Sequence, residues 1–416
     1  MLGPELPLVS ALPFVALLLV IAVAPLIAPR WWHDNRNKAL VAGLISLPIV
    51  VYLGWQRPEL LAEKALEYVG FIVVIGALFV IAGGIHIQGS LAGTPLVNTA
   101  MLGIGAILAN LTGTTGASVL LIRPLLRANT RRKRVAHIVI FFIFIVANCG
   151  GLLTPIGDPP LLLGFLKGVP FRWTLQLWPQ WLFVNGVLLV IFNVWDQWAL
   201  NKDEKELPGS QHEQVLIHEP LEIKGLLPIV ALLLVMASIV MAWPTWVVAL
   251  LGVLGYLAGS AELRTKNDFK IGPIVEVAVL FAAIFVTMAP MLEILNAHAP
   301  TLGLSTPAHF FWATGSLSSV LDNAPTYLAF AAAAAGLQHI PPHGAYIGLI
   351  DPRMLAAIST GAVFMGANTY IGNAPNFMVR AIAEERGVKM PSFFGYLAYS
   401  IGILLPLFIA VALVFF

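Results

Sequence analysis

Long apolar stretches recur along most of the chain, and short polar stretches separate them. A helix that crosses the hydrocarbon core of a bilayer needs about 20 predominantly apolar residues. The pattern predicts spanning helices at 6–28, 38–54, 68–88, 134–148, 175–199, 225–241, 244–260, 271–294, 350–366 and 394–416. We therefore expect an all-α polytopic membrane protein.

Two further apolar segments, 92–126 and 305–338, carry Gly, Pro, Thr or Asn near their centres. Each is too long and too interrupted for one span, so we predict two re-entrant hairpins whose arms meet at a polar tip. Non-helical backbone at membrane depth survives only where protein or water covers it. Each tip is therefore a candidate buried site.

Composition and charge support this interpretation. Of the 416 residues, 59% are hydrophobic and 11% are charged, whereas soluble domains have about 25% charged residues. If the N-terminus is periplasmic, most of the 23 Lys and Arg residues fall on the cytoplasmic side, as the positive-inside rule requires. This topology leaves five basic residues on the opposite face: Arg57, Lys64, Lys167, Arg172 and Arg353. The first apolar stretch lacks a basic residue before it and a cleavage site after it, so we expect a retained span.

The two halves of the chain contain related segments. Thr154–Pro160 resembles Thr369–Pro375, and Gly113–Ala117 lies opposite Asp322–Thr326 at nearly the same offset. An odd number of crossings in each half would place the second half upside down, the inverted-repeat plan of secondary transporters. We predict a first repeat at 1–200 with its hairpin at about 92–126 and a broken helix at about 134–168. A cytoplasmic linker at 201–224 precedes a second repeat at 225–416, with its hairpin at about 305–338 and a broken helix at about 350–385.

The interrupted segments combine helix breakers with short oxygen-bearing side chains. Freed carbonyls, amide oxygens, hydroxyls and carboxylates are hard donors that suit an alkali cation, although half-helix N-termini could also hold an anion. An ionisable residue inside a span is a functional candidate, which singles out Asp158 and Asp322, one in each half. Each could instead cap a half-helix. The predicted ion- or substrate-binding residues are Asp322, Asn323, Thr326, Asp158, Thr154, Thr114, Thr115, Asn148, Thr369, Asn373 and Asn376.

At these residues the chain resembles the ion transporter superfamily, which includes NhaD-type sodium/proton antiporters, arsenite permeases and CitMHS-type citrate transporters. The resemblance rests mainly on Gly113–Ser118, Asn148–Pro160, Ser318–Thr326 and Gly372–Phe377. It implies an elevator-type transporter in which a scaffold domain holds a homodimer together and a transport domain carries both hairpins. The dicarboxylate branch has Ser-Asn-Thr at its hairpin tips, whereas the tips here read Gly-Thr-Thr and Asp-Asn-Ala.

These observations favour a sodium (or lithium)/proton antiporter in the inner membrane of a bacterium. The transported Na⁺ would bind near Asp322, Asn323, Asp158 and Asn373. Cation- or proton-coupled transport of citrate or another carboxylate is the alternative, followed by arsenite transport and, last, a channel or intramembrane enzyme. No metalloprotease, nucleophile-elbow, phosphate-loop or dinucleotide motif is present in the sequence, so we expect no enzyme activity and no cofactor. The expected partners are the lipid bilayer and a small ion or molecule, with no nucleic acid.

Overall fold

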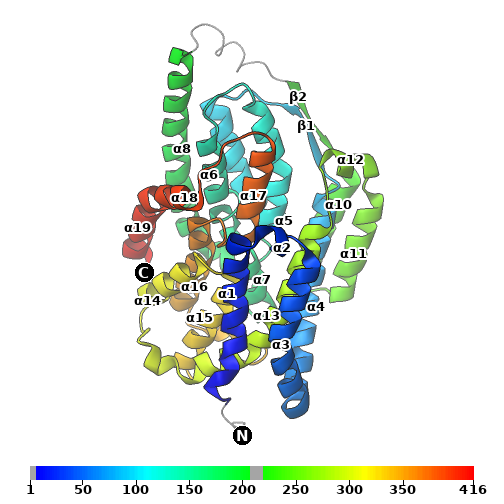
Figure 1. Ribbon diagram of the computed structural model, residues 1–416, viewed down its shortest axis with the longest axis vertical. Helices are drawn as coiled ribbons and strands as arrows, with labels where there is room; N and C mark the ends of the chain where they lie inside the picture. Colours follow the sequence, from blue (N-terminus) through cyan, green and yellow to red (C-terminus); the bar gives the residue numbers. More distant parts are fainter. Residues whose placement is uncertain (1–5, 207–218) are drawn as a thin grey trace.

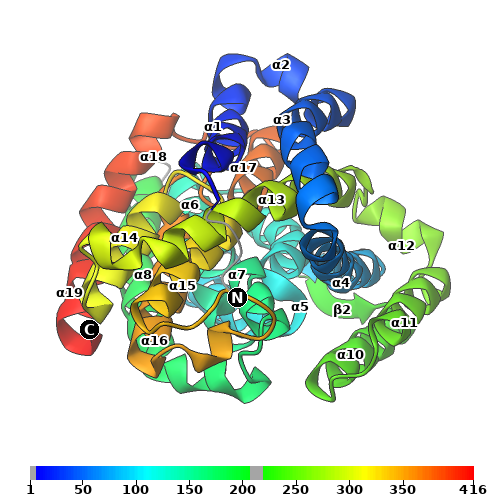
Figure 2. The same cartoon turned by 90° about the horizontal axis from the view of Figure 1, so that it is seen from below.

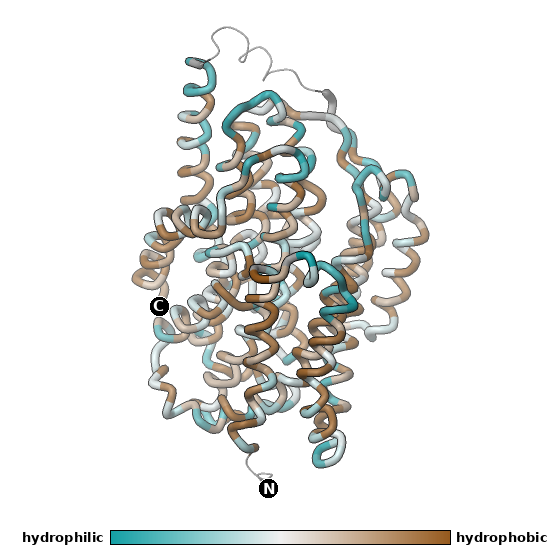
Figure 3. Tube along the Cα trace, in the orientation of Figure 1, coloured by the Kyte–Doolittle hydropathy of each residue, from teal (hydrophilic) through white to brown (hydrophobic). Residues whose placement is uncertain are grey.

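The computed structural model describes residues 6–206 and 219–416, which are almost entirely helical (Figure 1). Within these ranges, eight helical stretches are long and apolar enough to cross a membrane. Hydrophobic residues predominate along the middle of the long helices, and hydrophilic residues gather at the top and bottom of the molecule (Figure 3). The prediction of an all-α polytopic membrane protein is confirmed.

The first half of the chain runs from α1 to α8. Its elements are α1 (Leu12–Ile27), α2 (Pro29–Trp32), α3 (Asn35–Gln56), α4 (Pro58–Ala82), β1 (His86–Ser90), α5 (Pro95–Ala128), α6 (Ala136–Ile145), α7 (Pro159–Leu166) and α8 (Trp178–Glu206).

The second half runs from β2 to α19. Its elements are β2 (Glu219–Lys224), α10 (Leu226–Val240), α11 (Thr245–Ala258), α12 (Ala261–Lys266), α13 (Gly272–Ala297), α14 (Pro307–Ser318), α15 (Asn323–Leu337), α16 (Pro352–Met365), α17 (Ala374–Glu385), α18 (Phe393–Tyr399) and α19 (Leu405–Phe415). A π-helical turn, Ser400–Leu404, joins the last two helices.

The two orthogonal views divide the helices into groups. Figures 1 and 2 show α3, α4, α10, α11 and α12 on one side of the molecule and α8, α14, α16, α18 and α19 on the other. Helices α5, α6, α7, α15 and α17 lie towards the centre (Figure 2). Helix α6 lies within the core, since Ile138–Val146 are all at most 1% exposed. Residues 146–152, which directly follow α6, are buried as well.

Helix α5 folds back on itself at Gly113. This glycine has φ +76°, a conformation that residues with a side chain rarely adopt. The two arms lie side by side, because a Cβ atom on Gly105 would come within 3.1 Å of Leu121. At the open end, Asn98 and Asn129 exchange side-chain hydrogen bonds of 3.0 and 2.8 Å. The first predicted hairpin segment is thus a pair of antiparallel arms in the structure.

The predicted span at 68–88 was wrong in its bounds. Helix α4 begins at Pro58, a residue suited to the first turn of a helix because its missing N–H would have no partner there. The helix ends before Gly83 and Gly84, and His86–Ser90 forms a strand instead. That strand pairs antiparallel with β2, with Ile87 opposite Ile223.

The second half also differs from the prediction in helix length. Helices α10 and α11 have 15 and 14 residues, so each is about 22 Å long, shorter than the roughly 30 Å hydrocarbon core. The predicted polar linker 201–224 is partly regular structure, because α8 continues to Glu206 and β2 begins at Glu219. Its middle part, 207–218, lies outside the described residues.

Candidate functional site

Four interruptions of helical structure meet at one carboxylate, Asp158. They are the tip of α5 at Gly113, the segment 146–158 between α6 and α7, the segment 319–322 between α14 and α15, and the segment 366–373 between α16 and α17. Side chains from or next to the other three donate hydrogen bonds to Asp158. Both halves of the chain therefore build this site.

The carboxylate of Asp158 is 1% exposed. Its Oδ1 accepts hydrogen bonds from Thr114 Oγ1 at 2.7 Å and from Asn373 Nδ2 at 3.2 Å. Its Oδ2 accepts one from Asn323 Nδ2 at 2.5 Å. All three donors are neutral, and within the described ranges no Arg or Lys forms an ion pair with Asp158. An ionised carboxylate here would lack a compensating positive charge.

Local backbone structure positions these donors. Gly113 turns the α5 chain so that the N–H of Thr114 reaches the carbonyl of Gly157 at 2.8 Å, directly before Asp158. Asp158 immediately precedes Pro159, which starts α7. Asn323 is the first residue of α15, and Asn373 is the last residue before α17. Each polar side chain thus sits at the start of a half-helix, where the backbone N–H groups have no helical partner.

Three asparagines extend the site away from Asp158. Asn373 Nδ2 lies 3.2 Å from Asn148 Oδ1, and Asn148 Nδ2 donates to Asn376 Oδ1 at 2.6 Å. Asn376 Nδ2 in turn donates to the carbonyls of Gly366 and Thr369, both at 2.9 Å. This chain ties the first broken helix to the second across the interior.

One buried acceptor next to Asp158 has no partner. The side-chain oxygen of Asn323 makes no hydrogen bond with any described residue, although its nitrogen bonds to Asp158. A buried unpaired acceptor costs about 1–3 kcal/mol. It is therefore the kind of oxygen atom that a cation could bind.

Asp322 lies next to this site but has a different environment. It is half-buried, and its Oδ1 accepts a hydrogen bond from the N–H of Ala324 at 3.0 Å, so it caps α15. The Thr326 hydroxyl donates to the Asp322 carbonyl at 2.9 Å, within the first turn. Asp322 therefore caps α15, which is one of the two roles that the sequence suggested for it. Its role in ion exchange stays a prediction.

The threonines of the two broken helices make matching contacts. Thr154 Oγ1 donates to the carbonyl of Asn110 at 2.6 Å, and Thr369 Oγ1 donates to the carbonyl of Ser319 at 2.5 Å. Thr154 thereby connects its segment to α5, and Thr369 connects its segment to the end of α14. Both hydroxyls donate to backbone carbonyls, and their role as ion ligands stays a prediction. Thr115 is half-buried and makes no side-chain hydrogen bond to a described residue.

A buried carboxylate in α8 was not among the residues predicted from the sequence. Asp196 is 0% exposed and accepts hydrogen bonds from Arg132 at 2.6 Å, His137 at 2.7 Å and Asn98 at 2.9 Å. Its position within the predicted apolar span 175–199 could have identified Asp196, because a charged residue inside a span is a functional candidate. Because Asn98 also bonds to Asn129, this cluster fixes the open end of α5 to α6 and α8.

A second missed cluster lies between α4 and the end of α7. Lys64 and Lys167 were predicted on the outer face, yet both are only 2% exposed. Their ammonium groups lie 3.0 and 2.7 Å from Glu67 Oε1. The misplaced start of α4 hid this cluster, since Lys64 and Glu67 were expected before the span.

The comparisons with known proteins agree with a transporter. A family described as "Putative citrate transport" matches residues 3–249 and 245–416, which together cover nearly the whole chain. The family is part of the ion transporter superfamily, so the resemblance found in the sequence is confirmed, and it points to a transporter and not an enzyme. The search of curated proteins finds no match. The chain belongs to this citrate-transport family and is a multi-pass membrane protein that works as a secondary transporter of a small molecule or ion.

Proposed function

We propose that the protein exchanges Na⁺ or Li⁺ for H⁺ and that Asp158 binds either ion. The observation that carries this proposal is that the Asp158 carboxylate is buried and that its hydrogen-bond donors among the described residues are all neutral. A carboxylate in a protein interior needs a compensating positive charge, because burial of an unpaired charge is costly. A sodium ion or a proton can supply that charge, but one excludes the other. This competition couples the movements of the two ions.

The oxygen atoms around Asp158 suit an alkali cation. Besides the carboxylate, the unpartnered side-chain oxygen of Asn323 and the hydroxyl of Thr114 are hard donors. Asp322, at the start of α15, adds a negative charge near the site without being fully buried. The transported cation is the substrate, and the exchange requires no further cofactor.

Two inverted repeats, 1–200 and 225–416, would form this site between them and carry it across the bacterial inner membrane. The matching contacts Thr154 to Asn110 and Thr369 to Ser319 support the repeats, since the sequence comparison pairs these two threonines. The same comparison pairs Asp158 with Asn373. The paired positions in the two halves thus hold an acid, Asp158, and its amide counterpart, Asn373, so only the first half supplies the buried charge. An elevator motion in a homodimer remains the expected mode of transport.

Coupled transport of citrate or a related carboxylate is the second candidate, because of the family description. Recognition of a polycarboxylate usually relies on Arg, Lys or helix N-termini. The half-helix starts at Asn323 and Asn373 could serve that purpose. The charge of Asp158 opposes it, unless a cation bound there travels with the anion.

The two candidates are separated by proton movement in proteoliposomes that contain a pH-sensitive dye. We expect Na⁺ or Li⁺, but not citrate, to drive proton movement in the wild type, and Asp158→Asn to abolish it. Asp351→Asn is the matched control, because Asp351 caps α16 through the N–H groups of Arg353 and Met354 and Asn is an equally good cap. Signals that require citrate and survive Asp158→Asn would overturn the antiport proposal.

A further inference from the structure

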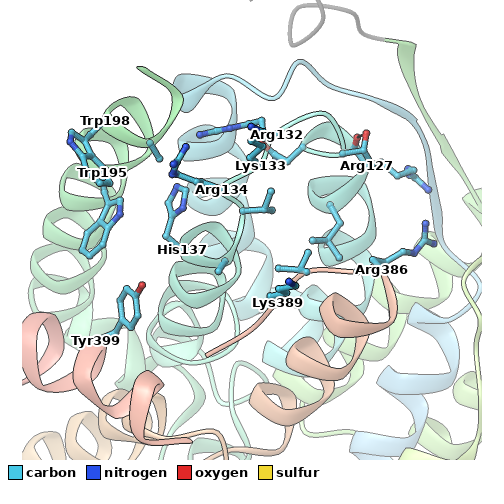
Figure 4. A pocket seen from close by; sticks show the side chains of 18 residues that line it. Arg127, Arg132, Lys133, Arg134, His137, Trp195, Trp198, Arg386, Lys389 and Tyr399 are labelled. Carbon is cyan, nitrogen blue, oxygen red and sulfur yellow. Dashed lines mark hydrogen bonds between the residues drawn. The ribbon is translucent and has the colours of Figure 1, made fainter. Parts of the chain in front are cut away.

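A basic cavity lies at the end of the molecule where the connection between α5 and α6 meets the end of α17. Its volume is about 970 Å³. The cavity wall includes Arg127, Arg132, Lys133, Arg134, Arg386 and Lys389, and no Asp or Glu of the described residues lines it (Figure 4). None of the residues that surround Asp158 is part of its lining. The cavity is therefore separate from the proposed transport site.

Two of these cations have no ion pair within the described ranges. Arg132 pairs with Asp196, and Arg134 pairs with Asp203. Arg386 and Lys389 are exposed and form no ion pair with any described residue. Positive charge on one wall of the cavity is thus available to a ligand.

The cavity lies at the level of a membrane surface. Trp195 and Trp198 of α8 line it together with Tyr399 (Figure 4). Trp178 begins the same helix, and the rise from there to Trp198 is about 30 Å, the thickness of a hydrocarbon core. The side chains of Trp178 and Trp198 are both more than half exposed. Tryptophans at this spacing are typical of the two interfaces of a spanning helix, where lipid headgroups lie.

We propose that this cavity binds a phosphate-bearing anion at the cytoplasmic surface of the membrane, with the level of the tryptophans favouring an anionic lipid headgroup over free phosphate. Basic pockets between spanning helices on this side of a membrane bind such headgroups. Arg386 and Lys389 follow α17, while Arg127 and Arg132 flank the open end of α5. A bound phosphate would therefore link the end of α17 to the base of the first hairpin.

The test compares the full-length wild type with the double variant Arg386→Gln/Lys389→Gln in detergent micelles. Thermal unfolding is followed during titration with phosphatidylglycerol, with phosphatidylcholine, and with inorganic phosphate at constant ionic strength. The matched control is Arg30→Gln/Arg36→Gln, which removes two exposed charges outside the cavity. All three proteins should unfold at the same temperature without additives, because none of the four side chains has an ion pair with a described residue.

We expect phosphatidylglycerol to stabilise the wild type and the control, and phosphatidylcholine to stabilise neither. Each basic residue near a headgroup contributes about a fivefold factor in affinity, so the double variant should need about 25-fold more phosphatidylglycerol. Stabilisation by inorganic phosphate alone, lost in the double variant, would support the site with a free anion as its ligand. The proposal would be overturned if the double variant and the control responded equally to phosphatidylglycerol and equally to inorganic phosphate.

Discussion

The carboxylate of Asp158, in the first half of the chain, accepts a 2.5 Å hydrogen bond from Asn323 Nδ2, in the second half. The contact spans 165 residues of sequence and joins the start of α7 to the start of α15. Asn373 adds a further contact from the second half at 3.2 Å. The polar centre of the protein therefore forms only when both halves are packed together, so ion binding there can respond to their relative movement.

Replacement of Asn323 by Ala should weaken cation binding. The substitution removes the donor to Asp158 Oδ2 and the unpartnered oxygen that we assign to the cation. Loss of one hydrogen bond to a buried charged group costs about 1.5–3 kcal/mol, which corresponds to an apparent Na⁺ affinity lower by about 10- to 150-fold. Concentration dependence of Na⁺-driven proton movement in proteoliposomes measures this change.

The control for that variant is Asn193→Ala. Asn193 is half-buried in α8 and donates to Thr99 at 3.0 Å, away from Asp158. Its replacement should leave the apparent Na⁺ affinity within about twofold of wild type. An equal loss of affinity in both variants would mean that general destabilisation, and not contact with the cation, explains the effect of Asn323→Ala.

Replacement of Asp322 by Asn should have a milder effect than replacement of Asp158. Asn preserves the cap of α15, and solvent screens the charge of the half-buried Asp322 more than that of Asp158. We expect a severalfold higher Na⁺ concentration for half-maximal exchange and a nearly unchanged maximal rate. Complete loss of exchange with normal folding would instead place the essential carboxylate at Asp322.

Substitution of Gly113 by Ala should disturb the tip of α5. The backbone of Gly113, with φ +76° and ψ +155°, lies in a region that is essentially confined to glycine and costs a residue with a Cβ about 1–3 kcal/mol. An added Cβ would also lie 3.3 Å from the carbonyl of Ile156. Thermal unfolding in detergent should therefore occur at a lower temperature, and exchange should slow. Gly43→Ala in α3 is the control, since its Cβ would meet no atom within 4 Å. That variant should unfold at or above the wild-type temperature.

Glu67→Gln should destabilise the protein more than a surface substitution does. The change removes the carboxylate that pairs with the buried Lys167, whereas Lys64 keeps its ion pair with Glu63 at 3.2 Å. Removal of one partner from a buried ion pair costs about 3–5 kcal/mol. The temperature of unfolding in detergent measures the loss. Glu59→Gln, an exposed position in the first turn of α4, should change it little. Equal unfolding temperatures for the two variants would show that the Glu67 cluster contributes little to stability.

Local chemistry made part of the site predictable. Gly113 and Pro159 are helix breakers, so the interruptions beside Thr114 and Asp158 could be located without a structure. The similarity of Thr154–Pro160 to Thr369–Pro375 also indicated that Asp158 and Asn373 hold related places. The hydrogen bonds among Asp158, Thr114, Asn323 and Asn373 depend on the packing of four separate elements, which no local pattern specifies.

The bounds of α4 and the cluster around Glu67 depend on packing, so the sequence did not predict them. The apolar run through Ile85 concealed the end of α4 at Ala82, because hydropathy does not distinguish a buried strand from the last turn of a helix. The bounds of α4 in turn decided whether Lys64 lay in a loop or in the interior. The contact of Lys167 with Glu67 joins two helices far apart in the sequence, so only the three-dimensional fold reveals it.

In the proposed exchange one carboxylate, Asp158, carries either a cation or a proton. Proton release on Na⁺ binding tests it most directly, measured with a pH indicator in weakly buffered detergent solution, with choline chloride as the ionic-strength control. We predict that wild type releases protons on addition of NaCl or LiCl, that Asp158→Asn releases none, and that Asp351→Asn behaves as wild type. Sodium binding without proton release in the wild type, or release that persists in Asp158→Asn, would show that Asp158 does not exchange a proton for the cation.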